Sequence, residues 1–257
     1  MNAAFSVKRL FWLLFLIISP LLLLACWYAP VTNSFSRVGV IVSGVMTLIG
    51  VSVTVWRFRI WRRVLIVVVV GVLLFVFCPW FGRYSHQELR RAYVQELESY
   101  IGAPYVWGGE GRFGIDCSGL ARRGLIDALL KEGFRQRSPV LVREALWLWW
   151  HDSTAKGIGE FYSGIGKTFF YVDEEKVLLN EFDYDRRQPL PRGVMATNDT
   201  HIMIYLGNKE WIGADPSEGK VVKFHIPETK SYYFSTPMKL VYWDVLNAKN
   251  GMDGYGY

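Results

Sequence analysis

Long apolar runs fill the first third of this 257-residue chain, and the polar residues between them are mostly basic. Uncharged stretches cover about residues 10–29, 38–56 and 64–82. Each approaches the ~20 apolar residues that an α-helix needs to cross the hydrocarbon core of a bilayer. The pattern therefore predicts a membrane domain over residues 1–82 with three transmembrane helices.

Basic residues flank these runs unevenly. Lys8 and Arg9 precede the first run, and the loop between the second and third runs holds arginines at positions 57, 59, 62 and 63. The positive-inside rule places the N-terminus and this loop in the cytoplasm. Three crossings then put the chain after Arg83 on the opposite side of the membrane.

The first run has an alternative interpretation that depends on Cys26. A basic start followed by an apolar run that ends in LLLLAC also resembles a lipoprotein signal with its lipid-accepting cysteine. The bulky Leu24 and the aromatic pair after Cys26 fit that pattern poorly. With cleavage before Cys26, two crossings remain and the C-terminal part still lies outside.

From residue 83 the pattern becomes that of a globular domain, which we place at residues 83–246. The spacing of apolar residues predicts helices over residues 86–100, 117–131 and 139–152. Short alternating runs joined by Gly and Asn turns then predict antiparallel strands in HIMIYLG, WIGA, GKVVKFHI and MKLVYWDV. We expect residues 153–166 to be a loop, residues 247–257 to be a flexible tail, and the fold class to be α+β.

Cysteine usage singles out one thiol. Cys26 and Cys78 fall within the predicted spans, which leaves Cys117 alone in the exported part, where cysteines are usually paired. Cys117 opens a predicted helix, whose N-terminal N–H groups favour the nucleophilic thiolate. His201, at the start of a predicted strand, is the best candidate for the base that takes the thiol proton.

Three segments around these residues resemble the NlpC family of bacterial cell-wall cysteine peptidases. They are Y-x-W-G-G from Tyr105, D-C-S-G from Asp116 and H-x-x-I-Y-L-G from His201. The resemblance implies a papain-like core, with N-terminal helices packed on an antiparallel sheet, in which Cys117 is the nucleophile. It also implies that Tyr105 and the backbone N–H of Cys117 stabilise the oxyanion. Substrate-binding roles are implied for Trp107, Asp116 and Ser118, the last two as holders of the substrate's free amino terminus.

The implied activity is hydrolysis of peptidoglycan stem peptides, typically at the D-γ-glutamyl to diaminopimelate bond, through a thioester on Cys117. The implied location is the bacterial inner membrane, with the catalytic domain facing the periplasm or the cell exterior. No cofactor or metal is expected. The partners are the wall peptide, the lipid bilayer and, because an unregulated wall hydrolase is dangerous, an envelope regulator. The net charge of +6 is supplied by the N-terminus and inner loop and requires no nucleic acid.

The chain departs from the family at the residue that should orient the histidine. Family members usually have a polar residue about a dozen positions after the base, where this chain has Gly213. Asp215 is the candidate third catalytic residue: it would lie directly across from His201 if the turn at residues 207–209 had three residues, but on the opposite face if it had two. Asn198 and Asp199 are the reserve candidates.

The spacing between Cys117 and His201 exceeds that of compact family members, and the excess lies within residues 134–191. This insertion holds the Trp-rich helix and is interpreted as a substrate lid, an element resting on the outer leaflet or an extra packing layer. Two other functions stay open. One is an inactive scaffold or binding protein of the cell envelope, and the other is a papain-like hydrolase or acyltransferase acting on lipid or other amide substrates.

Overall fold

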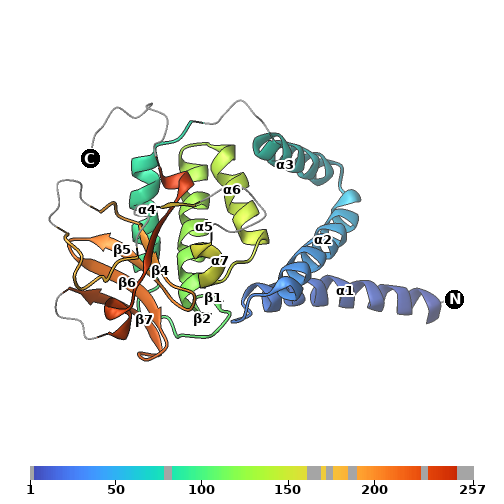
Figure 1. The fold of residues 1–257 in the computed structure, drawn as a ribbon. Coiled ribbons are helices and arrows are strands. Elements are labelled where there is room, and N and C mark those ends of the chain that lie inside the picture. Colours follow the sequence, from blue (N-terminus) through green and yellow to red (C-terminus); the bar gives the residue numbers. More distant parts are fainter. Residues whose placement is uncertain are drawn as a thin grey trace. The chain divides into compact units, whose positions relative to one another are not determined.

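The computed structural model describes residues 3–77, 83–160, 169–171, 176–184, 190–226 and 231–247. The chain divides into two compact units, Met1–Cys78 and Pro79–Tyr257 (Figure 1). Apart from Asn247, the expected flexible tail lies outside the described residues.

Three helices form the described part of the first unit: α1 (Ala3–Trp27), α2 (Ser34–Trp56) and α3 (Arg59–Phe77). Asn33 begins α2 with a capping box, in which its side chain accepts a hydrogen bond from the Ser36 backbone and the Ser36 side chain accepts one in return. Helices α1 and α2 pack closely, because a Cβ on Gly39 would lie 2.7 Å from Cys26 Sγ.

Among the residues that the structure describes, two helices and not three meet the length and composition needed to cross a membrane. They are α2 and α3, while the apolar part of α1 that qualifies runs only over Trp12–Trp27. The first of the three predicted spans, over residues 10–29, is therefore not supported as a crossing, and the helix there, α1, ends at Trp27.

The second unit contains a six-stranded antiparallel sheet with strand order β3-β8-β4-β5-β6-β7 (Figure 1). Its strands are β3 (Phe169–Tyr171), β4 (Met195–Thr197), β5 (Ile202–Gly207), β6 (Glu210–Asp215), β7 (Lys220–His225) and β8 (Lys239–Trp243). The α+β class is confirmed, and β5 to β8 are the four strands that the sequence predicts. Three-residue strands such as β4, buried at every position, carry no alternation by which a pattern could find them.

Four helices accompany the sheet: α4 (His86–Glu98), α5 (Cys117–Arg135), α6 (Pro139–Trp150) and α7 (Ala155–Gly159). The prediction that this helix ends near residue 131 is wrong, because α5 continues through Gly133 to Arg135. Gly133 lies inside the helix where α6 crosses it, and a Cβ there would come within 2.8 Å of Val142 Cγ2. Likewise, α7 occupies part of the segment expected to be a loop. A small hairpin of β1 (Glu110–Gly111) and β2 (Gly114–Ile115) precedes α5.

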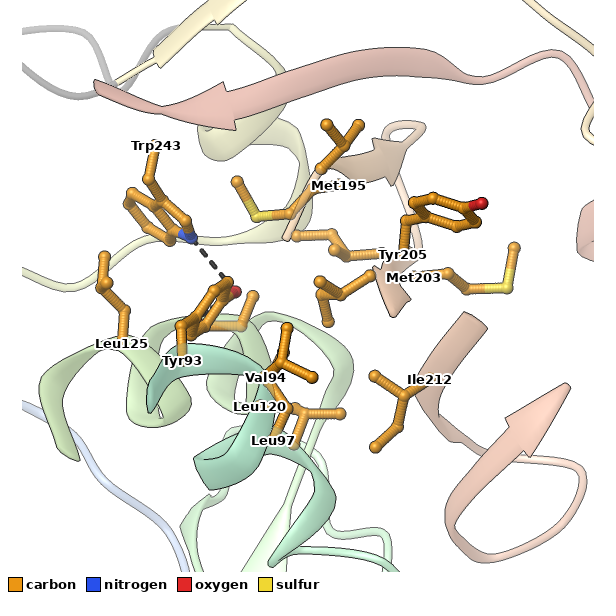
Figure 2. Packing of buried hydrophobic residues seen from close by; sticks show 14 of the residues in the cluster. Tyr93, Val94, Leu97, Leu120, Leu125, Met195, Met203, Tyr205, Ile212 and Trp243 are labelled. Atoms are coloured by element: carbon orange, nitrogen blue, oxygen red, sulfur yellow. Dashed lines mark hydrogen bonds between the residues drawn. The ribbon is translucent and has the colours of Figure 1, made fainter. Parts of the chain in front are cut away.

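The core lies between helices α4 and α5 and the face of the sheet (Figure 2). Leu97 on α4 and Leu120 on α5 are fully buried, as is Ile212 on β6. A polar link crosses this core: Trp243 Nε1 donates to the Tyr93 hydroxyl at 3.2 Å, and that hydroxyl donates to the Ala121 carbonyl at 3.1 Å. The link satisfies both buried polar groups and joins α4, α5 and β8.

Helix α6, the Trp-rich part of the insertion, is fixed to α5 through a buried arginine. The Arg122 guanidinium donates to Glu110 Oε1 at 2.8 Å, to the Leu148 carbonyl at 2.8 Å and to the His151 carbonyl. These bonds satisfy carbonyl groups at the C-terminal end of α6. The contacts of α6 agree with the packing-layer interpretation of the insertion, within the part of residues 134–191 that the structure describes.

Candidate active site

Cys117 is the first residue of α5, and two glycines bring the preceding loop against this end of the helix. A Cβ on Gly119 would overlap the carbonyl oxygen of Gly109, and a Cβ on Gly109 would overlap that of Gly114. The Asp116 N–H also donates a hydrogen bond to the Gly109 carbonyl at 3.0 Å, which joins the same two segments. Gly109 and Gly119 are therefore required by close backbone contact, which holds the loop against the helix end that carries the thiol.

Asp116 caps α5 and also fixes the loop. Its Oδ1 accepts from the Gly119 N–H at 2.6 Å and from the Ser118 hydroxyl at 2.9 Å. Its Oδ2 accepts from the Gly108 N–H at 2.8 Å. A carboxylate at an N-cap pairs favourably with the first-turn N–H groups and with the helix dipole. Asp116 thus has a clear structural role, while the substrate-binding role of Asp116 and Ser118 stays a prediction.

The Cys117 thiol is buried, with 4% of the residue exposed, and it donates a 3.9 Å hydrogen bond to the Thr200 carbonyl. Burial and the Asp116 carboxylate raise the pKa of the thiol to about 12. The backbone N–H groups of Ile202, Ser118 and Cys117 itself act in the opposite direction. We expected the helix N-terminus to lower this pKa, but desolvation outweighs it because the side chain lies inside the protein.

His201 directly precedes β5. The backbone at His201 passes close to the thiol, because Cys117 contacts backbone groups of Thr200 and Ile202 on either side of it. Its backbone N–H donates to Asn198 Oδ1 at 2.7 Å, and the Thr200 N–H donates to the same oxygen at 2.9 Å. Asn198, a reserve candidate for orienting the imidazole, therefore holds the backbone turn instead. Burial lowers the pKa of His201 to about 4, against an opposing effect of Asp215.

The turn between β5 and β6 has two residues, Asn208 and Lys209, both with positive φ. By itself this would put Asp215 on the opposite face from His201. However, a bulge shifts the register by one residue between Gly207 and Tyr205, so that Tyr205 pairs with Trp211. Continued along the strand, the shifted register sets Asp215 opposite His201, the arrangement that we had expected from a three-residue turn.

Asp215 nevertheless directs its carboxylate toward its own turn. Oδ1 accepts from the Ser217 N–H at 2.7 Å and from the Ser217 hydroxyl at 2.5 Å. Among the described residues, no hydrogen bond or ion pair joins Asp215 to His201. Asp215 therefore acts on His201 through its charge, and its place in a catalytic triad stays a prediction.

Gly213 faces the edge of the imidazole that lacks a partner. A Cβ at this position would lie 3.7 Å from His201 Nε2. His201 is only 1% exposed, and its Nε2 has no hydrogen-bond partner within the described part of the chain. The position where the family usually has a polar side chain thus points at Nε2 and supplies no donor or acceptor.

Tyr233 stacks on the imidazole, a contact that sequence reasoning missed. The ring centroids of His201 and Tyr233 are 3.7 Å apart, with an interplanar angle of 12°. Tyr233 belongs to a short 3-10 helix, η1 (Tyr232–Ser235). In the sequence it is one of many aromatic residues in a strand-rich region, and no motif spacing relates it to His201.

Tyr105 and Trp107 come from the loop before α5 and differ in exposure. Tyr105 is half-buried, and its pKa is raised by burial and by the nearby Cys117, Asp116, Tyr233 and Asp215. Its hydroxyl consequently stays neutral. Trp107 is 76% exposed, and its side chain makes no hydrogen bond or ring contact with a described residue. The structure thus groups Tyr105 with Cys117 and leaves Trp107 on the surface.

Comparisons with known proteins cover about half to two thirds of the chain. No protein-family model matches the chain. Dipeptidyl-peptidase 6 of Lysinibacillus sphaericus is 31% identical over 135 residues, which cover 46% of this chain and 45% of that protein. The chain therefore matches less than half the length of this curated relative.

Similar solved structures include two described as peptidoglycan hydrolases. The NlpC/p60 domain of SagA has a TM-score of 0.34 at 21% identity, covering 60% of this chain and 97% of that domain. RipB from Mycobacterium tuberculosis has a TM-score of 0.35 at 19% identity, covering 62% of this chain and 67% of that structure.

Proposed function

We propose that the second unit is an NlpC-type, papain-like cysteine peptidase or amidase that hydrolyses peptidoglycan stem peptides. The observation that carries this proposal is the position of Cys117 at the N-terminus of α5, in contact with the backbone on both sides of His201. A nucleophile at a helix N-terminus with a base beside it is the arrangement that acyl transfer requires. The curated relative, which is named a peptidase, agrees with this assignment.

In the proposed mechanism both groups start neutral, because the pKa of Cys117 is raised and that of His201 is lowered. Nε2 faces Gly213, so Nδ1 is the ring nitrogen available to the thiol. As Sγ bonds to the carbonyl carbon, His201 takes the thiol proton and then gives it to the leaving amine. Water, deprotonated by His201, releases the acid from the thioester and restores the thiol.

The oxyanion of each tetrahedral intermediate needs donors where negative charge develops. The backbone N–H of Cys117 supplies one, since the first N–H groups of a helix have no partner within the helix. The neutral Tyr105 hydroxyl supplies the second. We propose that the exposed Trp107 binds the stem peptide by surface contact, and that Asp116 with Ser118 receives its free amino terminus. The proposed bond is D-γ-glutamyl to diaminopimelate.

We propose that α2 and α3 anchor this unit in the bacterial inner membrane. The connection between them carries Arg57, Arg59, Arg62 and Arg63, which the positive-inside rule assigns to the cytoplasm. With that connection inside, the chain leaves α3 on the outer face, whether or not α1 also crosses. The catalytic unit then faces its wall substrate, where a regulatory envelope protein can reach it.

The test uses the full chain in detergent micelles with purified muropeptides, analysed by mass spectrometry. Cys117→Ala should abolish cleavage, and Cys26→Ala, which removes a thiol outside the proposed site, should leave it unchanged. The masses of the fragments identify the bond. Absence of cleavage by the wild-type chain, together with no iodoacetamide labelling of Cys117 in alkaline buffer, would refute the peptidase assignment.

The second candidate is a non-catalytic binding protein of the cell envelope. Two observations favour it: the partnerless Nε2 of His201 and the buried thiol of Cys117 with its raised pKa. Muropeptide binding by the wild-type chain distinguishes the two candidates. A scaffold binds the peptide and returns it intact, whereas a peptidase returns fragments.

A further inference from the structure

The imidazole of His201 lacks the polar contact that would ordinarily fix its orientation. Nε2 faces Gly213 and has no partner among the described residues, and the Asp215 carboxylate is bonded to Ser217. Rotation of a histidine ring about χ2 is governed by a broad torsional minimum, so burial alone sets the ring plane only loosely. Another contact must define that plane if the ring is to meet the thiol.

Tyr233 provides such a contact through its face. The two rings are nearly parallel, at 12° and 3.7 Å between centroids. A flat aromatic surface at this separation limits tilting of the imidazole but makes no demand on which ring nitrogen carries the proton. Such a contact can therefore hold the imidazole in one orientation both before and after it accepts a proton during turnover.

The 3-10 helix that carries Tyr233 is itself fixed in place. The adjacent Phe234 is 1% exposed and packs edge-on against Phe224, with ring centroids 5.4 Å apart. The Asn180 N–H donates to the Phe234 carbonyl at 3.2 Å, and its side-chain amide donates to Ser235 Oγ at 3.3 Å. Tyr233 therefore rests on a segment held by both core packing and hydrogen bonds.

We propose that Tyr233 is the positioning residue of His201, replacing the polar partner that Gly213 cannot supply. The inference rests on the proposed function, because it concerns the base that serves Cys117. The tyrosine face also favours the imidazolium that forms when His201 takes the thiol proton, since the negative face of an aromatic ring attracts a cation. This attraction opposes the desolvation that disfavours the charged ring in the interior.

The experiment measures the rate of iodoacetamide alkylation of Cys117 against pH in the full chain with Cys26 and Cys78 replaced by alanine. In parallel, NMR follows the His201 imidazole, whose signal among the four histidines is assigned by its loss in His201→Gln. Tyr233→Leu should slow alkylation at neutral pH about tenfold and lower the pKa of His201 further. Tyr233→Phe, which keeps the ring, should stay within about twofold of the wild type.

Tyr232→Leu is the matched control, because Tyr232 lies on the same short helix but is 75% exposed, and its ring meets the edge of Tyr233, with centroids 6.0 Å apart, and not the imidazole of His201. It should change neither measurement. If Tyr233→Leu fails to fold, pentafluorophenylalanine at position 233 keeps the flat surface but reverses the charge distribution of the ring face, and it should lower the pKa of His201 in the same direction. A wild-type titration of His201 in either variant, or wild-type alkylation in Tyr233→Leu, would overturn the inference.

Both measurements are made without substrate. A Tyr233 effect in a protein that cleaves no muropeptide would therefore support the inference while contradicting the proposed muropeptide substrate. Cleavage with no Tyr233 effect on alkylation or on the His201 titration would support the proposed function and refute the inference.

Discussion

Acidification should destabilise the second unit through His201. Burial lowers the pKa of its imidazole from 6.5 to about 4, so the folded protein keeps the ring neutral where the unfolded chain protonates it. Because the folded-state value is the lower one, this contribution is fully present above pH 6.5 and is lost as the pH falls toward 4. The full difference corresponds to about 3 kcal/mol, of which about 2 kcal/mol is lost by roughly pH 5.

Urea unfolding of the full chain in detergent, followed by tryptophan fluorescence, measures this loss. Trp211 and Trp243 are fully buried in the second unit and report its unfolding. Between about pH 7 and pH 5, the wild type should lose about 2 kcal/mol more of its unfolding free energy than His201→Gln, whose side chain does not titrate. His225→Gln, at an exposed strand position, controls for removing a histidine. Equal losses in the wild type and His201→Gln would refute the assignment of a buried neutral imidazole.

Three further predictions concern the Cys117 region. Asp116→Asn should lower the unfolding free energy by roughly 1–2 kcal/mol in urea titrations, because the charge at the helix cap is lost and the amide nitrogen that replaces Oδ2 cannot accept from the Gly108 N–H; an unchanged midpoint would contradict this role of the carboxylate. Gly119→Ala should reduce activity even though alanine is the better helix former, since the added Cβ meets the Gly109 carbonyl. Circular dichroism together with a muropeptide assay separates misfolding from loss of activity. The iodoacetamide rate of Cys117 should climb into the alkaline range, because burial raises the thiol pKa to about 12, whereas a plateau at neutral pH would indicate a preformed ion pair.

The local chemistry of the chain was largely predictable from sequence. A helix start is encoded by neighbouring residues, so the cap at Asp116 and the thiol at the first position of α5 could be expected from the D-C-S-G segment. The strands from β5 to β8 carry turn signals and β-branched or aromatic residues within a few positions. The end of α5 was mispredicted, because packing against α6 and not local composition decides whether the helix continues through Gly133.

The relation between His201 and its surroundings was decided by tertiary structure. A bulge at one end of β5 shifts every later pairing by one residue, and that shift sets Asp215 opposite His201 despite a two-residue turn. The stacking of Tyr233 depends on a core anchor, Phe234, that joins segments distant in sequence. By itself, the sequence determined which residues could do chemistry and which helix presents the thiol, since both follow from nearest neighbours. Only the packed sheet decided which groups face the base and how deeply it is desolvated, because register, burial and ring contacts depend on residues far apart along the chain.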